Sequence, residues 1–309
     1  MSPRRAPSPA LRTAARSTAV LGAVAAGCLA WAAGVEVRSY RLRRVEVPVL
    51  PAGQAPLRLL HVSDLHMTPG QRRKQEWVRA LARLEPHLVV TTGDNLASPG
   101  AVPAVLHALE PLLERPGAFV LGSNDYFGPK PKNPARYFQG PSRAPSRPQL
   151  LPTQDLVDGM VGAGWADLTN DRATLAVDGR RVDLVGVDDP HLQQDRYLSV
   201  SAPADPSADL SLGVVHAPYR RVLDAMTTDG LDLLLAGHTH GGQLCVPGVG
   251  ALVTNCDLPR RCAKGLHRWT RGRAGTWLHV SAGLGTSPYA PVRFACPPEA
   301  TLLTLVAEG

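Results

Sequence analysis

Polar clusters rich in histidine and aspartate follow short apolar runs of this sequence. Five such clusters occur: Asp64-x-His66, Gly93-Asp94-Asn95, Gly122-Ser123-Asn124-Asp125, His216 and Gly237-His238-Thr239-His240-Gly241-Gly242. Brought together, they offer as ligands two Asp (Asp64 and Asp94), four His and an Asn. Carboxylate oxygens and neutral imidazoles suit divalent ions such as Mn, Fe, Zn or Mg. A shared carboxylate can hold two such ions about 3.5–4 Å apart. The clusters therefore point to a pair of divalent cations.

Each cluster taken alone permits a simpler interpretation. Asp64-x-His66 occurs by chance and can cap a helix, and Gly93-Asp94 can be an ordinary turn. A lone His216 is more often a hydrogen-bonded core residue than a ligand. His238-x-His240 is a stronger signal, because alternation places both rings on one side of an extended segment. The recurrence of clusters after five apolar runs favours the metal site.

The apolar runs predict the strands that position these side chains. They span Leu57–Val62, Leu88–Thr92, Ala118–Leu121, Leu210–Val215 and Leu231–Leu235. Helical spacing over Arg72–Leu84 and Val102–Leu113 separates the first three, an order that indicates parallel βαβ units. Carboxyl ends of parallel strands meet at one edge, where sites assemble. Further strands are expected at Ala173–Val177, Val182–Val187, Trp277–Ser281 and Thr301–Val306, the first two joined by the hairpin turn Asp178-Gly179.

The ordered series of clusters resembles the calcineurin-like metallophosphoesterase superfamily over about residues 57–307. The tail is similar to a membrane-associated bacterial branch that includes enzymes acting on lipid-linked or cell-wall phosphoesters. That tail reads Val280-Ser281-Ala282-Gly283-Leu284-Gly285, then Pro291-x-Arg293 and Pro297-Pro298-Glu299. The resemblance implies an α/β fold, a four-layer αββα sandwich of two mixed sheets. It also implies hydrolysis of a phosphoester by a hydroxide that two metal ions activate.

The same resemblance implies a ligand set for each ion. The first ion would be held by Asp64, His66, Asp94 and His240. The second would be held by Asp94, His216, His238 and a side-chain amide. Asp94 would thus bridge the two ions. Asn95 and Asn124 are expected to contact the phosphate oxygens and stabilise the charge that develops on them.

The third cluster departs from the family pattern. The family usually has Gly-Asn-His followed by an acidic residue, where Asn binds the second ion and His contacts the phosphate or protonates the leaving group. Aligned without a gap, Ser123 takes the ligand position and Asn124 takes the position of the His. A small loop shift would instead make Asn124 the ligand. No imidazole remains here, and general acid–base help is typically worth about 10²–10⁴-fold. The alternative function is therefore a membrane-anchored metal-binding sensor or binding protein.

The positive charge of the chain is confined to its N-terminus. The net charge is +7; residues 1–44 hold eight Arg and one acidic residue, and the remainder holds 25 basic and 25 acidic residues. A body without excess positive charge argues against nucleic-acid binding. The uncharged run Ser17–Val35 would span about 28 Å as a helix, close to the hydrocarbon thickness of a bilayer. We expect a membrane anchor at 17–35, with a signal peptide cleaved near Ala30-Trp31-Ala32 or a buried helix as alternatives.

Composition predicts the remaining boundaries. Residues 1–16 form a basic N-terminus, 36–56 a basic stem and 57–309 the catalytic domain. Residues 126–154 are basic and proline-rich without an acidic residue, which predicts a long loop, either solvated or a lid. A second basic group over 260–273 is either a solvated surface loop or a rim that attracts anionic substrates. Four of the five cysteines lie in the last quarter of the chain and fit either disulfides or buried thiols.

An anchor favours substrates that lie in the membrane. We therefore expect a phosphodiester of a lipid or a nucleotide-sugar lipid rather than a soluble monoester. The protein is expected to be a single-pass protein of the cell membrane, with its domain outside the cytoplasm. A short basic N-terminus ahead of an apolar run usually stays inside, which supports this side. The Arg residues after the run argue for the opposite side.

Overall fold

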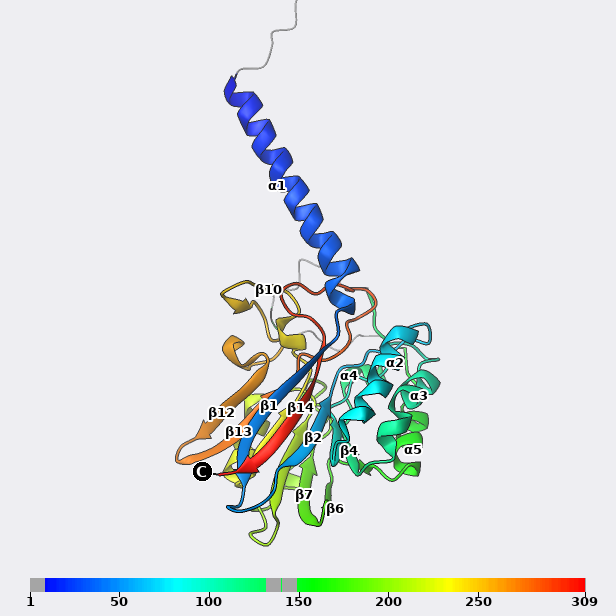
Figure 1. Ribbon diagram of the computed structural model, residues 1–309, viewed down its shortest axis with the longest axis vertical. Helices are drawn as coiled ribbons and strands as arrows, with labels where there is room; N and C mark the ends of the chain where they lie inside the picture. The colour runs from blue at the N-terminus through cyan, green and yellow to red at the C-terminus, as the bar shows by residue number, and fades with distance from the viewer. Residues whose placement is uncertain (1–8, 132–139, 141–148, 309) are drawn as a thin grey trace, which may run out of the picture.

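The computed structural model describes residues 9–131, 140 and 149–308. Two six-stranded mixed sheets pack against each other, and helices cover their outer faces (Figure 1). This arrangement is the four-layer αββα sandwich that the resemblance implies. The predicted fold class is therefore confirmed, together with one apolar N-terminal helix.

The first sheet carries the first three site loops. Its strands, in spatial order, are β1 (Arg41–Leu50), β14 (Glu299–Ala307), β2 (Leu57–Val62), β3 (Leu88–Thr91), β4 (Gly117–Phe119) and β5 (Ala166–Asp167). β2 to β5 run parallel to one another, while β14 is antiparallel to β2 and parallel to β1. β1 therefore begins at the same edge of the sheet at which β2, β3 and β4 end.

The second sheet carries the remaining site loops. Its strands, in spatial order, are β12 (Gly265–Arg271), β13 (Ala274–Val280), β9 (Leu233–Ala236), β8 (Leu210–Val215), β7 (Arg180–Gly186) and β6 (Arg172–Val177). The four central strands are parallel, and the edge strands β12 and β6 each run antiparallel to their neighbour. Asp178 and Gly179 join β6 to β7 with φ of 51° and 77°, which suits the predicted tight hairpin turn.

Helices complete the two outer layers. The first sheet is covered by α2 (Arg72–Ala80) with its continuation η2 (Leu81–Leu84), α3 (Val102–Leu113) and α5 (Thr153–Gly162). The second sheet is covered by α6 (Arg220–Thr228). Shorter elements are η1 (Glu36–Arg38), α4 (Ser123–Tyr126), η4 (Tyr197–Ser199), η5 (His240–Gly242), β10 (Cys245–Val246), β11 (Gly250–Ala251) and η6 (Arg260–Cys262).

Alternation along the strands divides the apolar core into layers. Val90 of β3 and Leu212 of β8 are fully buried and belong to the cluster between the sheets. Val89, one residue away, faces the opposite way and belongs with Leu109 of α3. Strands buried on both faces read as continuous apolar runs, which is why the sequence pattern located them. Each fully buried Val or Leu contributes about 1.5–3 kcal/mol to stability.

The helix α1 (Pro9–Gly34) extends away from the domain (Figure 1). It is long and apolar enough to cross a membrane, and only 6% of its apolar window is buried. Val20 and Leu21, for example, are 62% and 70% exposed. This exposure excludes the alternative of a buried core helix. The last turn contacts the domain, since Ala32 is buried and its carbonyl accepts a hydrogen bond from the backbone N–H of Arg293 at 3.2 Å.

Residues 36–56 differ from the predicted basic stem. Within them, β1 pairs with β14 along its whole length, so the segment belongs to the first sheet. Its second half buries Val47, Val49 and Leu50 in the core, while its arginines stay exposed. Charged residues are common on strands at the margin of a sheet. The arginines of this segment suggested a stem, although they lie on the exposed side of a strand.

The predicted loop 126–154 is described only near its ends. Phe127 and Leu150 form an antiparallel bridge, and the backbone N–H of Gly128 donates to the carbonyl of Gln149 at 2.8 Å. The ends of the segment are therefore held together. Residues 132–139 and 141–148, on which a lid role would depend, lie outside the described residues.

The second basic group, over 260–273, is largely ordered secondary structure. It comprises η6 and the marginal strand β12, which pairs with β13. Arg268 stacks over the ring of Trp277 at 4.9 Å from its centroid. Most of the segment predicted as a surface loop therefore forms a charged strand at the edge of its sheet, as β1 does in the first sheet.

The five cysteines are free thiols. Cys245, Cys262 and Cys296 are buried, whereas Cys28 is exposed on α1. The structure therefore agrees with the buried-thiol alternative.

Candidate metal centre

The candidate ligands all follow the carboxyl ends of strands, as their spacing predicts. Asp64 and His66 follow β2, Asp94 follows β3, and His216 follows β8. Five of the ligand candidates have left-handed backbone conformations: Asp64 (φ 50°), His66 (40°), Asp94 (56°), His238 (67°) and His240 (49°). Such conformations are uncommon outside glycine and gather at functional sites.

Backbone contacts hold the loops in register. The N–H of Asp64 donates to the carbonyl of Gly93, and the N–H of His66 donates to the carbonyl of Asp94, each at 2.9 Å. Gly237 lies so close to Asp64 that a Cβ there would come within 2.6 Å of the carboxylate oxygen Oδ2. The glycine of this cluster is therefore required by close approach of the two loops.

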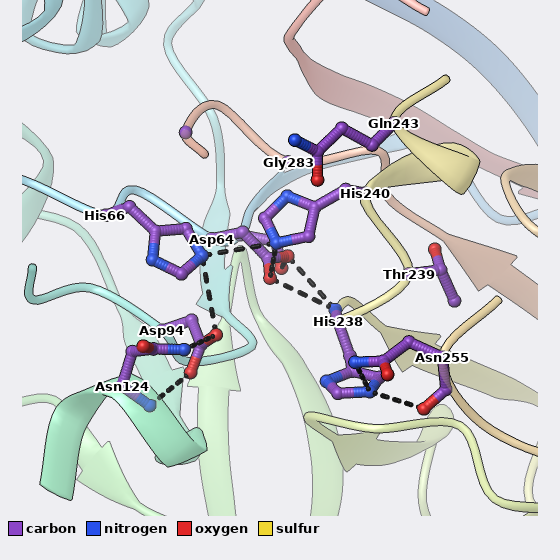
Figure 2. A network of polar contacts seen from close by, with 12 residues as sticks. Asp64, His66, Asp94, Asn124, His238, Thr239, His240, Gln243, Asn255 and Gly283 are labelled. Atoms are coloured by element: carbon purple, nitrogen blue, oxygen red, sulfur yellow. Dashed lines mark hydrogen bonds and ion pairs between the residues drawn. The ribbon is translucent and has the colours of Figure 1, made fainter. Parts of the chain in front are cut away.

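Four ligand candidates form one compact group. The ligand atoms of Asp64, His66, Asp94 and His240 all lie within 4.8 Å of one another. Nε2 of His66 lies 3.2 Å from Nε2 of His240 and 3.4 Å from Oδ2 of Asp94 (Figure 2). Nε2 of His240 lies 3.7 Å from Oδ1 of Asp64. These are the four residues that the resemblance assigns to the first ion.

A second group shares Asp94. Nε2 of His216 lies 3.4 Å from Oδ1 of Asp94, and Nδ1 of His238 lies 3.3 Å from the same Nε2. Nδ1 of His216 lies 2.6 Å from the carbonyl oxygen of Thr92, which orients the ring with Nε2 toward Asp94. Both groups therefore face one carboxylate, each from the side of a different oxygen.

Burial and neighbouring charge set the protonation of the centre. Burial lowers the pKa of His66 to about 4 and holds the pKa of His240 well below its ordinary value, so both rings are neutral at pH 7. Burial opposes ionisation of Asp94, but His216 and His66 outweigh it and lower the pKa of this carboxyl. His216 differs: burial favours its neutral form, yet the carboxylates of Asp94, Asp189 and Asp64 raise its pKa to about 9.

This donor set fits a divalent cation. The Nε2 atoms of two neutral imidazoles, His66 and His240, lie 3.2 Å apart, beside two carboxylates. In the tautomers that direct both lone pairs inward, these acceptors repel one another unless a cation lies between them. Ligand bonds of about 2.0–2.2 Å place opposite ligand atoms about 4–4.4 Å apart, which agrees with the 4.8 Å limit of the first group.

Asn124 lies against the shared carboxylate. Its side-chain Nδ2 donates to Oδ2 of Asp94 and its backbone N–H donates to Oδ1, both at 2.7 Å (Figure 2). The hydroxyl of Ser123 lies 3.5 Å from Nδ2 of Asn124. Of the two ligand alternatives for the third cluster, this geometry favours Asn124, whose amide can also present its oxygen to a cation.

Asn95 is fully buried behind the centre. Its Nδ2 lies 3.4 Å from Oδ2 of Asp125, and its backbone N–H donates to Oδ1 at 2.7 Å. Asp125 also accepts the N–H of Asp94 at 2.8 Å and of Gly122 at 3.0 Å. Asp125, to which the sequence analysis assigned no role, thus clamps the loop of Asp94. The structure places Asn95 beside this clamp rather than on an open face where it would meet a phosphate.

Arg293 is a second residue to which no role was assigned. It is fully buried, and its Nη2 lies 3.3 Å from Nδ1 of His240. The same nitrogen donates to the carbonyls of Ala282 at 2.7 Å and Gly285 at 2.8 Å. The sequence held a signal for a buried role of Arg293: it is a single charged residue after 19 residues, 274–292, that contain no Asp, Glu, Lys or Arg.

The loop after β7 adds further polar residues. His191 lies with its ring centroid 4.6 Å from that of His238. Asp189 is buried and accepts the N–H of His191 at 2.8 Å. On the other side of His238, Asn255 lies with Nδ2 3.2 Å from Nε2. Val187-Asp188-Asp189-Pro190-His191 is itself a polar cluster after an apolar strand, so the rule that found the ligands applies to it as well.

Fold and site together define a metal-dependent hydrolase of phosphoester bonds. The sequence profile described as calcineurin-like phosphoesterase matches residues 57–242, more than half of the chain, and the chain belongs to that family. The family implies bound divalent metal ions, which the ligand groups described above fit.

Several known proteins are similar to this chain. The metallophosphoesterase YkuE of Bacillus subtilis is 24% identical over 303 residues, which cover 93% of this chain and 94% of YkuE. A transmembrane protein with a metallophosphoesterase domain from Bos taurus is 28% identical and covers 85% of this chain and 56% of its own length. The solved dimetal phosphatase of Danio rerio has a TM-score of 0.42 and 11% identity, covering 74% of this chain and 88% of its own.

Proposed function

We propose that the protein is a membrane-anchored phosphodiesterase that uses two divalent cations to hydrolyse a lipid-linked phosphodiester. The observation that carries this proposal is the position of Asp94 between two imidazole groups. One carboxylate oxygen lies 3.4 Å from His66 and the other lies 3.4 Å from His216. This is the arrangement that a bridging carboxylate requires.

The side chains have distinct roles in this proposal. One ion would be held by Asp64, His66, Asp94 and His240. The other would be held by Asp94, His216, His238 and Asn124. When bound, the two cations, whether Mn, Fe, Zn or Mg, would supply Lewis acidity and lower the pKa of a water molecule into the neutral range. Asp64, His66, Asp94, His216 and His238 are buried, and only His240 and Asn124 are partly exposed, so the charges act in a poorly solvated site where electrostatic stabilisation of a phosphoester is strong.

Protonation of the leaving group needs another residue, because the third cluster has no imidazole. His191 is suited to it in position and chemistry. Its ring is half-buried next to His238, and its Nδ1 lies 3.2 Å from the hydroxyl of Tyr219. Burial raises the pKa of Tyr219 to about 12, so this hydroxyl keeps its proton and can orient the imidazole. We assign His191 as the proton donor and Asn124 as the residue nearest the phosphate.

The lipid part of the proposal rests on α1. An exposed apolar helix attached to the domain holds the metal centre near a bilayer, where lipid phosphodiesters are concentrated. A single span with the domain outside the cytoplasm completes the proposal. Protease added to intact cells should then degrade the domain, and full protection of the domain would reverse this orientation.

One assay tests the proposed activity. Full-length protein in detergent micelles with Mn²⁺ would be given phosphatidylglycerol in mixed micelles, bis(p-nitrophenyl) phosphate and p-nitrophenyl phosphate. We expect hydrolysis of both diesters and slower hydrolysis of the monoester. The Asp94→Asn variant, purified in parallel, controls for contaminating phosphatases. Hydrolysis of the soluble diester alone would refute the lipid substrate, and no metal-dependent hydrolysis would favour the sensor alternative.

A further inference from the structure

The membrane helix and the metal centre lie at the same edge of the domain. β1 follows α1 and pairs with β14, which in turn pairs with β2 in the opposite direction. Arg41 at the start of β1 is level with Glu299, and His61 near the end of β2 is level with Thr301. The ligands Asp64 and His66 come directly after β2. The edge that carries the metal centre is therefore the edge at which α1 joins the domain.

Two uncharged loops protrude at this edge. Residues 241–256 contain no Asp, Glu, Lys or Arg, and neither do residues 274–292. Their tips expose apolar side chains: Val249 is 75% exposed and Tyr289 is 57% exposed. We name the tips Val246–Gly250 and Pro288–Pro291 the lipid-facing rim. Exposed apolar loops without flanking charges mark surfaces that contact an apolar partner.

Specific contacts near the bases of the two tips join their loops to each other and to α1. The side-chain amide of Gln243 donates to the carbonyls of Ala290 at 2.9 Å and Val292 at 3.0 Å. The N–H of Cys245 donates to the carbonyl of Phe294 at 2.8 Å, and the N–H of the intervening Arg293 donates to Ala32 of α1. Figure 1 shows β10, which begins the first tip, close to the base of α1.

The hairpin of the rim is also attached directly to the metal centre. η5 begins at the ligand His240 and leads into β10. After β11 the chain reaches Asn255, whose Nδ2 lies 3.2 Å from Nε2 of the ligand His238. Both ends of the hairpin are therefore anchored at candidate ligands.

We propose that the lipid-facing rim rests in the interface of the bilayer that α1 crosses. The bilayer is the partner that fits, because the rim lacks charges and its loops meet the domain at the base of α1, whose apolar side chains are exposed. A tyrosine suits the headgroup level, and exposed Arg38 in η1, which follows α1, suits anionic lipid. The metal centre then opens at headgroup depth, so a lipid phosphoester reaches it without leaving the membrane. This inference deepens the proposed function and rests on its membrane anchor.

The position of the rim can be measured without relying on hydrolysis. Full-length protein carrying Cys28→Ser would be reconstituted into liposomes of phosphatidylcholine and phosphatidylglycerol. A nitroxide spin label would be attached at Val249→Cys. Ala52→Cys, in the turn between β1 and β2 at the opposite edge, is the matched control. The accessibility of each label to oxygen, which concentrates in lipid, is compared with its accessibility to a water-soluble nickel chelate, and the Cys28→Ser parent gives the background from the buried thiols.

We expect the label at 249 to be more accessible to oxygen than to nickel, and the label at 52 to show the reverse. Equal nickel accessibility at both positions would place the rim in water and overturn the inference. A label at 249 shielded from both reagents would mean that protein covers the rim, and would overturn it too. Hydrolysis of bis(p-nitrophenyl) phosphate by the same samples separates a failure of this inference from a failure of the proposed activity.

Discussion

Arg293 connects the end of α1 to a candidate metal ligand. Its backbone N–H donates to the carbonyl of Ala32 in α1 at 3.2 Å, and its Nη2 lies 3.3 Å from Nδ1 of His240. The guanidinium is fully buried and donates to several backbone carbonyls of the loop that follows β13. Burial lowers the pKa of Arg293. A buried cation satisfied by carbonyls is well suited to fix the loop beside His240.

Replacing this cation should loosen the first ligand group. Arg293→Met leaves several buried carbonyls without a donor, and each costs about 1–3 kcal/mol, so we expect a loss of about 3 kcal/mol or more in urea unfolding. Because the residue also positions His240, the affinity for Mn²⁺ should fall about 10–100-fold. Arg261→Met, an exposed arginine, is the control. An unchanged Mn²⁺ affinity would limit Arg293 to a purely structural role.

Asn124 and Ser123 can be separated by paired substitutions. Asn124 donates to both oxygens of Asp94, whereas the hydroxyl of Ser123 lies 3.5 Å from Nδ2 of Asn124. Asn124→Ala should therefore lower kcat for bis(p-nitrophenyl) phosphate about tenfold or more, and Ser123→Ala should change it little. The measurement is steady-state kinetics at saturating Mn²⁺. The reverse order of effects would assign the ligand role to Ser123.

A proton donor is recognised by its dependence on the leaving group. His191→Ala should slow hydrolysis of a diester with an alkyl leaving group about 10²-fold, because an alkoxide must be protonated as it departs. Hydrolysis of bis(p-nitrophenyl) phosphate should change little, since p-nitrophenolate is a stable anion. His107→Ala, a histidine on α3, is the control. Equal slowing of both substrates would show that His191 positions the site and does not donate the proton.

The two ions should respond differently to pH, because each must displace a different proton. In the metal-free protein burial raises the pKa of Asp64 to about 6, while the pKa of His216 is about 9 through nearby carboxylates that outweigh burial. Binding of the first ion should therefore weaken as the pH falls through about 6. Binding of the second should strengthen as the pH rises from 7 to about 9, by about tenfold per pH unit. His66, whose pKa is about 4, adds nothing to the pH dependence of ion binding above pH 5.

Titrations with Mn²⁺ between pH 5 and pH 9, followed by calorimetry, check this prediction. His216→Ala removes the group that titrates at the second site and should leave only the dependence below pH 6. Affinities that stay constant over the whole range would show that Asp64 and His216 do not give up protons to the ions.

Interior strands could be predicted because burial on both faces leaves a continuous apolar run. The predicted bounds of Leu57–Val62, Val102–Leu113 and Leu210–Val215 are those of β2, α3 and β8. The polar residues after such strands are the candidate ligands, and their convergence follows from the parallel order. The edge strands β1 and β12 were missed, since they carry arginines on their solvent side and lack that signal.

Residues that act from behind the ligands were harder to predict. Asp125 clamps backbone N–H groups, and Arg293 is satisfied by carbonyls, so neither role depends on a partner side chain that a sequence pattern shows. The rim was missed for a related reason. Its residues are ordinary loop residues in the sequence, and only the strand order places them beside α1.

The central claim is that one carboxylate, Asp94, serves two cations. It is tested most directly by counting the manganese ions bound per chain at equilibrium in the wild type and in Asp94→Asn. The account predicts two ions per wild-type chain and the loss of both, or of all tight binding, in the variant. A wild-type chain that holds a single ion or none, or a variant that still binds two, would contradict it.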